Sequence, residues 1–211
     1  MNWIYSIAER LSLFFEAHGF YAFPALRQFR RDTGDGFQCV ILSISDYEDM
    51  SLAELHLGLR RDKVEQTAFP FTNGLPGFQP NSTTLITPLG KVMDQHPMRF
   101  RLRDEADLED MTIQCQEYIA QSGLPFLKRY DDLHALNVLF NTSPEKPCPW
   151  VHNQFHPAFR GLTVGALLAR DDLTVLVEQH RAALHRLGAY GRVLENYDRL
   201  ARYLLHYLRP N

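Results

Sequence analysis

Hydrophobic residues at the start of the chain recur with the period of an α-helix. Asn2 stands before them as the expected N-cap, and Gly19 stands where a helix would end. The positions on the apolar face are Trp3, Ile4, Ile7, Leu11, Phe14 and Phe15. We therefore predict an amphipathic opening helix.

After this helix, the pattern indicates a β-hairpin. The segment Phe20–Arg31 is expected to be extended around Pro24. Residues 33–36, with the sequence Thr-Gly-Asp-Gly, have the composition of a tight turn and lead into the apolar run 37–44. Two strands joined by this turn account for both runs.

Alternation of apolar and polar residues predicts further strands. In residues 54–60, three leucines alternate with polar residues or glycine, the period of a half-buried strand. The segments 82–87 and 98–103 are two more strand candidates, separated from the third strand by a loop at 68–81 that is rich in proline and glycine. The expected sheet is antiparallel and has about five strands.

The rest of the chain is predicted to be helical. Acidic residues at 104–110 begin an apolar-periodic helix that Gly123 and Pro125 are expected to end, and a shorter helix follows up to Phe140. Two last helices, over residues 173–187 and 193–208, are expected to form an antiparallel hairpin.

These elements predict an α+β fold, in which helices pack on the antiparallel sheet and the C-terminal third is helical. We expect a sheet domain at residues 1–141, a proline-rich connecting loop at 142–160, and a helical hairpin at 161–211 packed on the same domain. The composition, with 45% hydrophobic and 22% charged residues, is that of a chain that can bury a core.

Charge and cysteine content narrow the classes of function. The net charge of −3 and the lack of a basic stripe argue against nucleic-acid binding. No apolar run is long enough for a membrane span. Three widely separated cysteines offer neither a disulfide framework nor a paired metal motif. We therefore expect a soluble protein of the cytoplasm, and we expect no cofactor.

No motif predicts catalysis or metal binding. His152 and His156 have the spacing of a zinc pair, but Asn153 stands where a metalloprotease carries glutamate, and Pro157 is expected to exclude His156 from a helix. Cys148 lies near His152 in the sequence, yet it is flanked by prolines and is read as a simple loop thiol. We name no catalytic residue, and an enzyme is not the favoured class.

The leading candidate site is a basic face of the sheet. In residues 98–103 the arginines alternate with Met98, Phe100 and Leu102, so they are expected to project from the face opposite the core. The proposed site comprises Arg99, Arg101, His56, Arg60 and Gln38. Such a surface suits an acidic protein partner or an anionic small molecule.

Two other surfaces stay open as alternatives. A pocket beside the loop at 148–160 is expected to use His152, His156 and Arg160 as its polar groups. The last helix is rich in residue types that are common at interfaces, which makes a homodimer possible. Those residues are Tyr190, Tyr197, Tyr203, Tyr207, Arg192, Arg199 and Arg202.

Short motifs in the first two thirds of the chain resemble bacterial protein families of unknown function, some of them similar to immunity proteins of toxin systems. The resemblance covers roughly residues 8–140 and rests on the segments 17–20 (Ala-His-Gly-Phe), 29–31 (Phe-Arg-Arg), 37–40 (Phe-Gln-Cys-Val) and 54–59 (Glu-Leu-His-Leu-Gly-Leu). It carries over no functional residue. This resemblance, together with the lack of a recognisable catalytic motif, favours a noncatalytic protein-binding module of a regulatory or immunity-like kind. The alternative is a small-molecule enzyme or ligand-binding domain.

Overall fold

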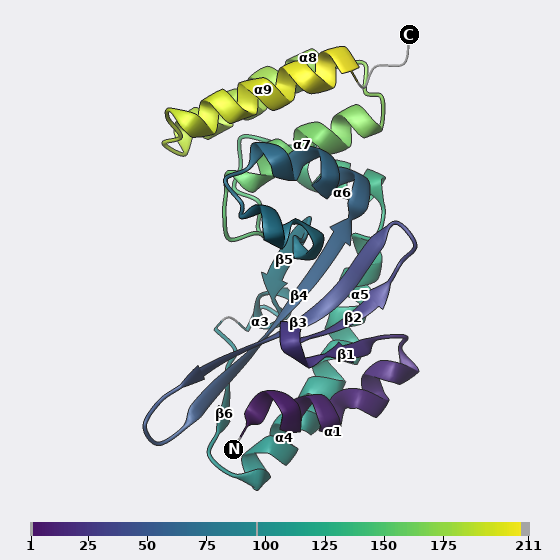
Figure 1. The fold of residues 1–211 in the computed structure, drawn as a ribbon, viewed down its shortest axis with the longest axis vertical. Helices are drawn as coiled ribbons and strands as arrows, with labels where there is room; N and C mark the ends of the chain where they lie inside the picture. Colours follow the sequence, from purple (N-terminus) through teal and green to yellow (C-terminus); the bar gives the residue numbers. More distant parts are fainter. Residues whose placement is uncertain (1, 96, 208–211) are drawn as a thin grey trace. The chain divides into compact units, whose positions relative to one another are not determined.

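The structure, a computed structural model, describes residues 2–95 and 97–207, the side chain of Tyr207 excepted (Figure 1). The chain forms two compact units. Unit 1 consists of Met1–Leu59 and Ile86–Arg129, and unit 2 consists of Arg60–Leu85 and Tyr130–Asn211. The predicted connecting loop at 142–160 lies wholly inside unit 2, and the division falls at other places in the chain.

The described residues form a six-stranded sheet in the order β1-β2-β3-β4-β5, with β6 also paired to β4. Strand β1 pairs antiparallel with β2, β2 with β3, and β4 with β6. The predicted α+β class, with an antiparallel sheet and a helical C-terminal part, is confirmed. The strands are β1 (Tyr21–Phe23), β2 (Gln28–Asp32), β3 (Gly36–Asp46), β4 (Ser51–Arg61), β5 (Leu85–Pro88) and β6 (Phe100–Leu102).

The predicted opening helix is present as α1 (Trp3–Ala17), and Gly19, just after its C-cap His18, adopts a positive φ of 77° that favours glycine. Helix α1 packs against β1, β3 and α4 (Glu105–Tyr118). The ring of Phe15 stacks on Phe29 of β2 with 3.9 Å between centroids, so the predicted apolar face of α1 is part of the core of unit 1.

The helix that begins at Asp104 does not end at Gly123 and Pro125 as predicted. The Asp104 carboxylate caps α4 by accepting a hydrogen bond from the Asp107 amide. A π-type turn at Ile119–Gly123 then leads directly into α5 (Leu124–Arg129). Because the π turn interrupts the α-helical ladder, Pro125 falls in the first turn of α5, where a missing amide hydrogen is tolerated.

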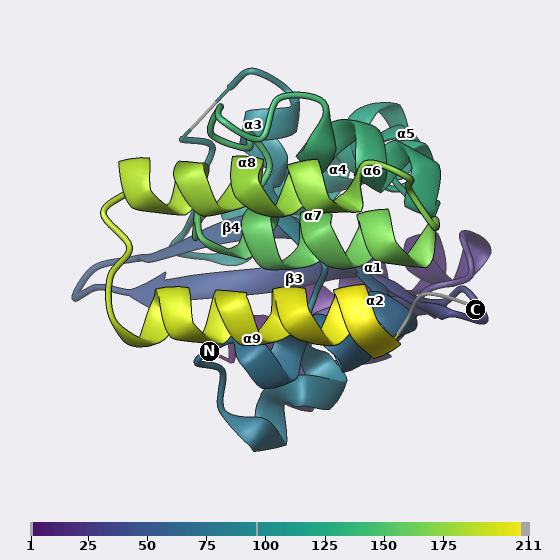
Figure 2. The same cartoon turned by 90° about the horizontal axis from the view of Figure 1, so that it is seen from above.

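Unit 2 is built around helix α7 (His156–Leu167), which packs against α2 (Asp62–Ala68), α6 (Leu133–Asn141), α8 (Leu173–Arg186) and α9 (Arg192–Tyr207). Figure 2 shows α7 lying between α8 and α9. The predicted hairpin is therefore α8 and α9, although its last predicted position, Leu208, lies outside the described residues. Short segments complete the fold: 3-10 turns at Pro24–Leu26, Phe69–Phe71 and Pro76–Asn81, and helix α3 (Leu89–Val92).

Helix α7 was missed because its sequence lacks an amphipathic period. All residues from Ala158 to Ala166 are buried, so no face is exposed to water and polar residues do not alternate with apolar ones. The expectation of a loop up to residue 160 was therefore wrong, since the helix begins at His156. Four of these buried residues, Ala158, Phe159, Leu162 and Ala166, belong to one core cluster with Leu173, Leu176, Leu184, Tyr197, Leu200 and Leu204.

Candidate ligand pocket

The predicted alternation in residues 98–103 is confirmed for strand β6. Arg101 is exposed, whereas Phe100 and Leu102 on either side of it are buried. Arg101 stands opposite Leu52 of β4 in the register, and Arg99, just before the strand, is also exposed. The two arginines therefore lie outside the core of unit 1.

Two members of the predicted basic face are not on an exposed face. Gln38 is 1% exposed, and its side chain hydrogen bonds to Arg31 and, over 3.4 Å, to the Leu127 carbonyl. Arg60 is 4% exposed, because its guanidinium donates to the carbonyls of Gln79 and Ser82 and pairs with Asp62. Both side chains satisfy internal polar groups, so the predicted five-residue surface was wrong for these two.

Glu54 also weakens the positive charge of the remaining face. Its carboxylate lies 3.9 Å from the Arg99 guanidinium and 3.9 Å from the His56 ring. The Glu54 side chain is only 19% exposed, so it is held in the sheet surface between the two basic residues. What remains is a pair of exposed arginines beside a partly compensated histidine, and not a broad cationic surface.

A cavity of about 190 Å³ lies at the start of α7, close to the predicted alternative pocket. Three stretches of chain that are distant in sequence form it: the end of the turn at Phe69–Phe71 with the residues after it, the residues leading into α7 with its first turn, and the start of α9. Its lining comprises Phe71, Thr72, Asn73, Gly74, Asn153, Phe155, His156, Phe159, Val193 and Asn196. We call it the His156 pocket.

The His156 pocket carries no charge at neutral pH. None of the described residues that line it is Asp, Glu, Lys or Arg. Burial, together with the nearby Arg160 cation and against the opposing effect of Glu65, lowers the pKa of His156 to about 4. His156 is therefore a neutral imidazole that can both donate and accept a hydrogen bond.

His156 is the first residue of α7, so the expectation that Pro157 would exclude it from a helix was wrong. Proline in the first turn of a helix lacks only an amide hydrogen that has no partner in the helix. The Asn153 side chain stabilises the residues at the start of α7. Its oxygen accepts a hydrogen bond from the Phe155 amide at 3.0 Å, and its nitrogen lies 3.2 Å from His156 Nε2. The imidazole is held in place by its own loop.

The opposite wall is contributed by α9. Asn196 is 8% exposed, and its amide nitrogen donates over a long 3.4 Å to the Asn73 side-chain oxygen. The amides of Asn73 and Asn196 are the polar groups that the sequence did not single out. They are 123 positions apart, and no local motif marks either one.

Arg160 lies behind the pocket, not in it. Its guanidinium makes a two-pronged contact with Glu65 of α2, with Nε–Oε1 at 2.7 Å and an Nη2–Oε2 distance of 3.1 Å. The Glu65 side chain is fully buried, and Arg160 with hydrogen bonds from Ser82 and Thr84 lowers its pKa although burial opposes this. His152 is exposed and does not line the cavity. Of the three predicted pocket residues, only His156 is in place.

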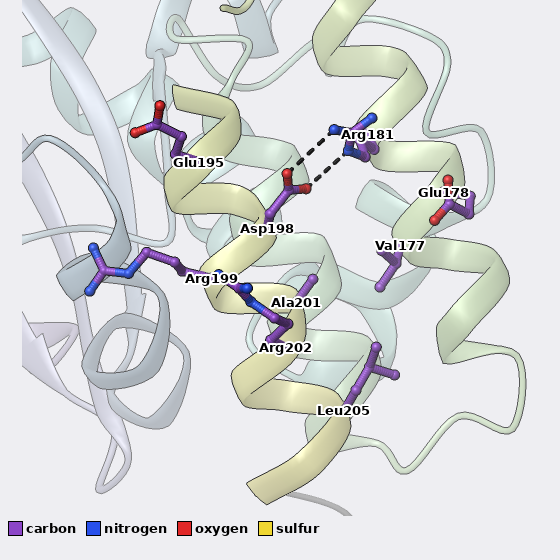
Figure 3. Close-up of a pocket in the computed structure, with 9 residues that line it drawn as sticks. All are labelled: Val177, Glu178, Arg181, Glu195, Asp198, Arg199, Ala201, Arg202 and Leu205. Atoms are coloured by element: carbon purple, nitrogen blue, oxygen red, sulfur yellow. Dashed lines mark hydrogen bonds and ion pairs between the residues drawn. The ribbon is translucent and has the colours of Figure 1, made fainter. Parts of the chain in front are cut away.

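A larger but shallower groove of about 560 Å³ runs between α8 and α9 (Figure 3). Its floor is apolar, from Val177, Ala201 and Leu205, and its rim is charged. Arg181 of α8 pairs with Asp198 of α9 at 3.0 Å, as the dashed lines in Figure 3 show. The charged groups of the groove thus include an ion pair that joins the two helices, and they do not converge on one point as polar groups in a ligand site do.

The aromatic residues of the last helix are divided between core and surface. Tyr197 is fully buried and donates to the Val177 carbonyl, whereas Tyr203 is exposed, as is Tyr190, which precedes α9. Phe71 lies 5.9 Å from the Tyr203 ring and 5.9 Å from the Arg199 guanidinium. The side chain of Tyr207 lies outside the described residues, and the homodimer stays a prediction.

Over residues 2–95 and 97–207, no cluster of three or more His, Cys, Asp or Glu side chains is arranged to hold a metal ion. Within the same residues, no helix has both the length and the apolar character needed to span a bilayer. The resemblance to immunity-like bacterial families stays a prediction. Comparisons with protein-family models, with curated proteins and with solved structures found no match to this chain.

Proposed function

We propose that this chain is a noncatalytic ligand-binding protein whose His156 pocket holds a small uncharged molecule with a planar polar group. One observation carries the proposal: a neutral imidazole and three asparagine side chains meet phenylalanine rings in a single cavity. Ligand sites typically combine apolar and aromatic walls with a few polar groups that fix orientation.

The lining selects for the charge of the ligand. An anion or a cation transferred into a pocket without a compensating charge would lose its hydration and gain no ion pair. A neutral group such as a carboxamide loses less, and it can donate to and accept from the asparagine amides and His156. An anionic ligand is therefore disfavoured at this position.

The same lining supports binding without catalysis. Thr72 supplies the hydroxyl among the described lining residues, and that hydroxyl donates to the Phe69 carbonyl at 2.8 Å. It is therefore engaged with the backbone and is not paired with His156 as an activated nucleophile would be. Near pH 7 His156 is a neutral imidazole, so it is not in the protonated form that a histidine general acid needs.

The ligand class is tested with isosteric pairs of probes. Nicotinamide and benzamide are expected to bind and to shift the NMR signals of residues 71–74, 153–159 and 193–196. Nicotinate and benzoate, which have the same ring but a carboxylate, are expected to bind at least tenfold more weakly because the pocket offers them no cation. If no amide probe binds, or if the carboxylates bind as tightly, the proposal is wrong.

Variants of two nearby histidines assign the site. His156→Ala is expected to weaken amide binding by about five- to tenfold, the loss that follows from one hydrogen bond of about 1 kcal/mol. His152→Ala is the matched control, because His152 belongs to the same segment but is exposed and outside the lining. Equal affinities of the two variants would place the ligand elsewhere.

A second candidate is docking of an acidic protein partner on unit 1, in a regulatory or immunity-like role. The exposed positions of Arg99 and Arg101 favour it. The double variant Arg99→Glu and Arg101→Glu is expected to abolish the recovery of an acidic partner by affinity purification from the native cell. The reason is that the new carboxylates would repel the acidic groups of the partner. Arg103→Glu is a poorer choice, since it breaks the local pair with Asp107. Unchanged recovery would exclude this face as the binding surface.

A further inference from the structure

A second cavity lies on the other side of the start of α7. Residues 153, 155, 156 and 159 line the His156 pocket, whereas Gln154, Pro157 and Ala158 line a cavity of about 130 Å³ bounded by α8. Among its lining residues, Ala158, His180, Ala183 and Leu184 are buried and form the inner end. Glu145, Lys146 and Arg186 are exposed and mark the mouth. We call it the His180 pocket.

The hydrogen bonds of Asn141 fix the state of the His180 ring. The Asn141 amide nitrogen donates to the Gly161 carbonyl and to the Asn137 side-chain oxygen, both at 2.9 Å. Asn141 Oδ1 is therefore an acceptor, and His180 Nε2, 2.8 Å away, must donate to it. In the neutral ring, the hydrogen is on Nε2 and the other nitrogen, Nδ1, is an acceptor.

This neutral state agrees with the surroundings of His180. Burial, with a smaller effect of Arg170, lowers the pKa of His180 to about 4. The side chain is 1% exposed. Residues 2–95 and 97–207 supply no hydrogen-bond partner for Nδ1, and the ring lines the cavity. Nδ1 is not one of the fully enclosed side-chain atoms that lack a partner in the described part of the chain, so it can be reached from the cavity. A ligand that donates a hydrogen bond there would supply the missing partner.

Gly161 makes the arrangement possible. A Cβ atom at this position would lie 2.5 Å from Asn141 Oδ1 and 2.9 Å from His180 Nε2. The backbone of α7 thus approaches the Asn141–His180 hydrogen bond so closely that only glycine fits. The imidazole is held from Nε2 by a packed, specific contact, which leaves Nδ1 as its remaining polar atom.

We infer that the His180 pocket binds a single small aromatic ring bearing a hydroxyl or N–H group, which donates to His180 Nδ1. The size fits one ring, since an engineered apolar cavity of about 150 Å³ binds benzene. The walls of the cavity also suit an aromatic ring, because they include the apolar side chains of Pro144, Pro147, Pro157 and Leu187. This inference does not rest on the proposed function, because the two pockets share no lining residue.

Phenol and fluorobenzene are the probes that test it. They are nearly equal in size, but only phenol donates a hydrogen bond. Titration followed by NMR is expected to shift the signals of residues 144–147, 154–158 and 180–187, with phenol bound at least fivefold more tightly than fluorobenzene. Nitrogen-15 spectra of the His180 ring are expected to show hydrogen on Nε2, and the Nδ1 signal is expected to move when phenol is added.

Two variants separate the pocket from the hydrogen bond. Ala183→Met fills the cavity with a flexible side chain and is expected to abolish the binding of both probes. His180→Leu is expected to reduce phenol binding to the level of fluorobenzene, and if this variant does not fold, the Nδ1 signal carries the test in the unmodified protein. Equal affinity for both probes, hydrogen on Nδ1 in the free protein, or phenol binding unchanged in Ala183→Met would overturn the inference.

Discussion

Replacement of Glu65 by glutamine is expected to lower the free energy of unfolding by about 3–5 kcal/mol. Glutamine keeps the shape of the side chain but removes the charge, so the Arg160 guanidinium is left as a cation without its counter-ion. Both side chains are buried, 0% exposed for Glu65 and 8% for Arg160, so water cannot replace the lost partner. Urea unfolding followed by circular dichroism measures the change.

Two controls give this result its meaning. The double variant Glu65→Leu and Arg160→Met removes both charges and is expected to recover most of the lost stability, because an apolar pair of similar volume is often as stable as a buried ion pair. Asp172→Asn breaks the more exposed Arg170–Asp172 pair of the same unit and is expected to cost less than about 1 kcal/mol. A Glu65→Gln loss as small as that of Asp172→Asn would contradict the burial of the pair.

Acidification from pH 7 to pH 4 is expected to destabilise the protein by several kcal/mol. The folded state holds His156 and His180 with pKa values near 4, whereas an unfolded histidine has a pKa of about 6.5. Between these values the unfolded chain binds more protons, so stability is full above about pH 6.5 and is lost as the pH falls toward 4. Each histidine contributes up to about 3 kcal/mol, from a difference of roughly 2.5 in pKa.

The effect should be measurable as a pH-dependent urea midpoint. Burial sets the sign of the pKa shift at both sites. Arg160 adds to it at His156 while Glu65 opposes it, and Arg170 adds to it at His180. His156→Phe is expected to remove about half of the slope between pH 6.5 and 4, because one of the two titrating groups is gone. Below about pH 4.5, protonation of Glu65 adds a further loss, since its pKa is also lowered in the folded state. A midpoint that stays constant down to pH 5 would show that neither ring is buried as a neutral imidazole.

Strand alternation and helical periodicity predicted most of the fold because many of the elements have one face in the core and one in water. The leucines of β4 are largely buried and Arg101 of β6 is exposed, as the alternation predicted. Helix α7 escaped detection for the opposite reason, since burial on all sides removes the contrast between faces. The extension of the helix past Gly123 and Pro125 depends on a π turn that no local motif indicates.

The candidate site was predictable only in part. The spacing of the histidines marked His156 as a candidate, and His156 lines a pocket. The burial of Gln38 and Arg60 was not predictable, because it depends on carbonyl groups that other segments of the chain supply. Glu65, the partner of Arg160, precedes it by 95 positions, and Asn73 and Asn196 meet across an even longer stretch. Such pairs are created by packing, and a single sequence carries no signal for them.

Nine consecutive residues of α7 are enclosed by four neighbouring helices. Few of them can therefore be replaced without a second substitution in a neighbouring helix. An interior packed at the density of an organic crystal accepts a larger side chain only if another one becomes smaller. Divergence along this helix must therefore proceed through compensated exchanges, in which a change at one position accompanies a change in a surrounding helix.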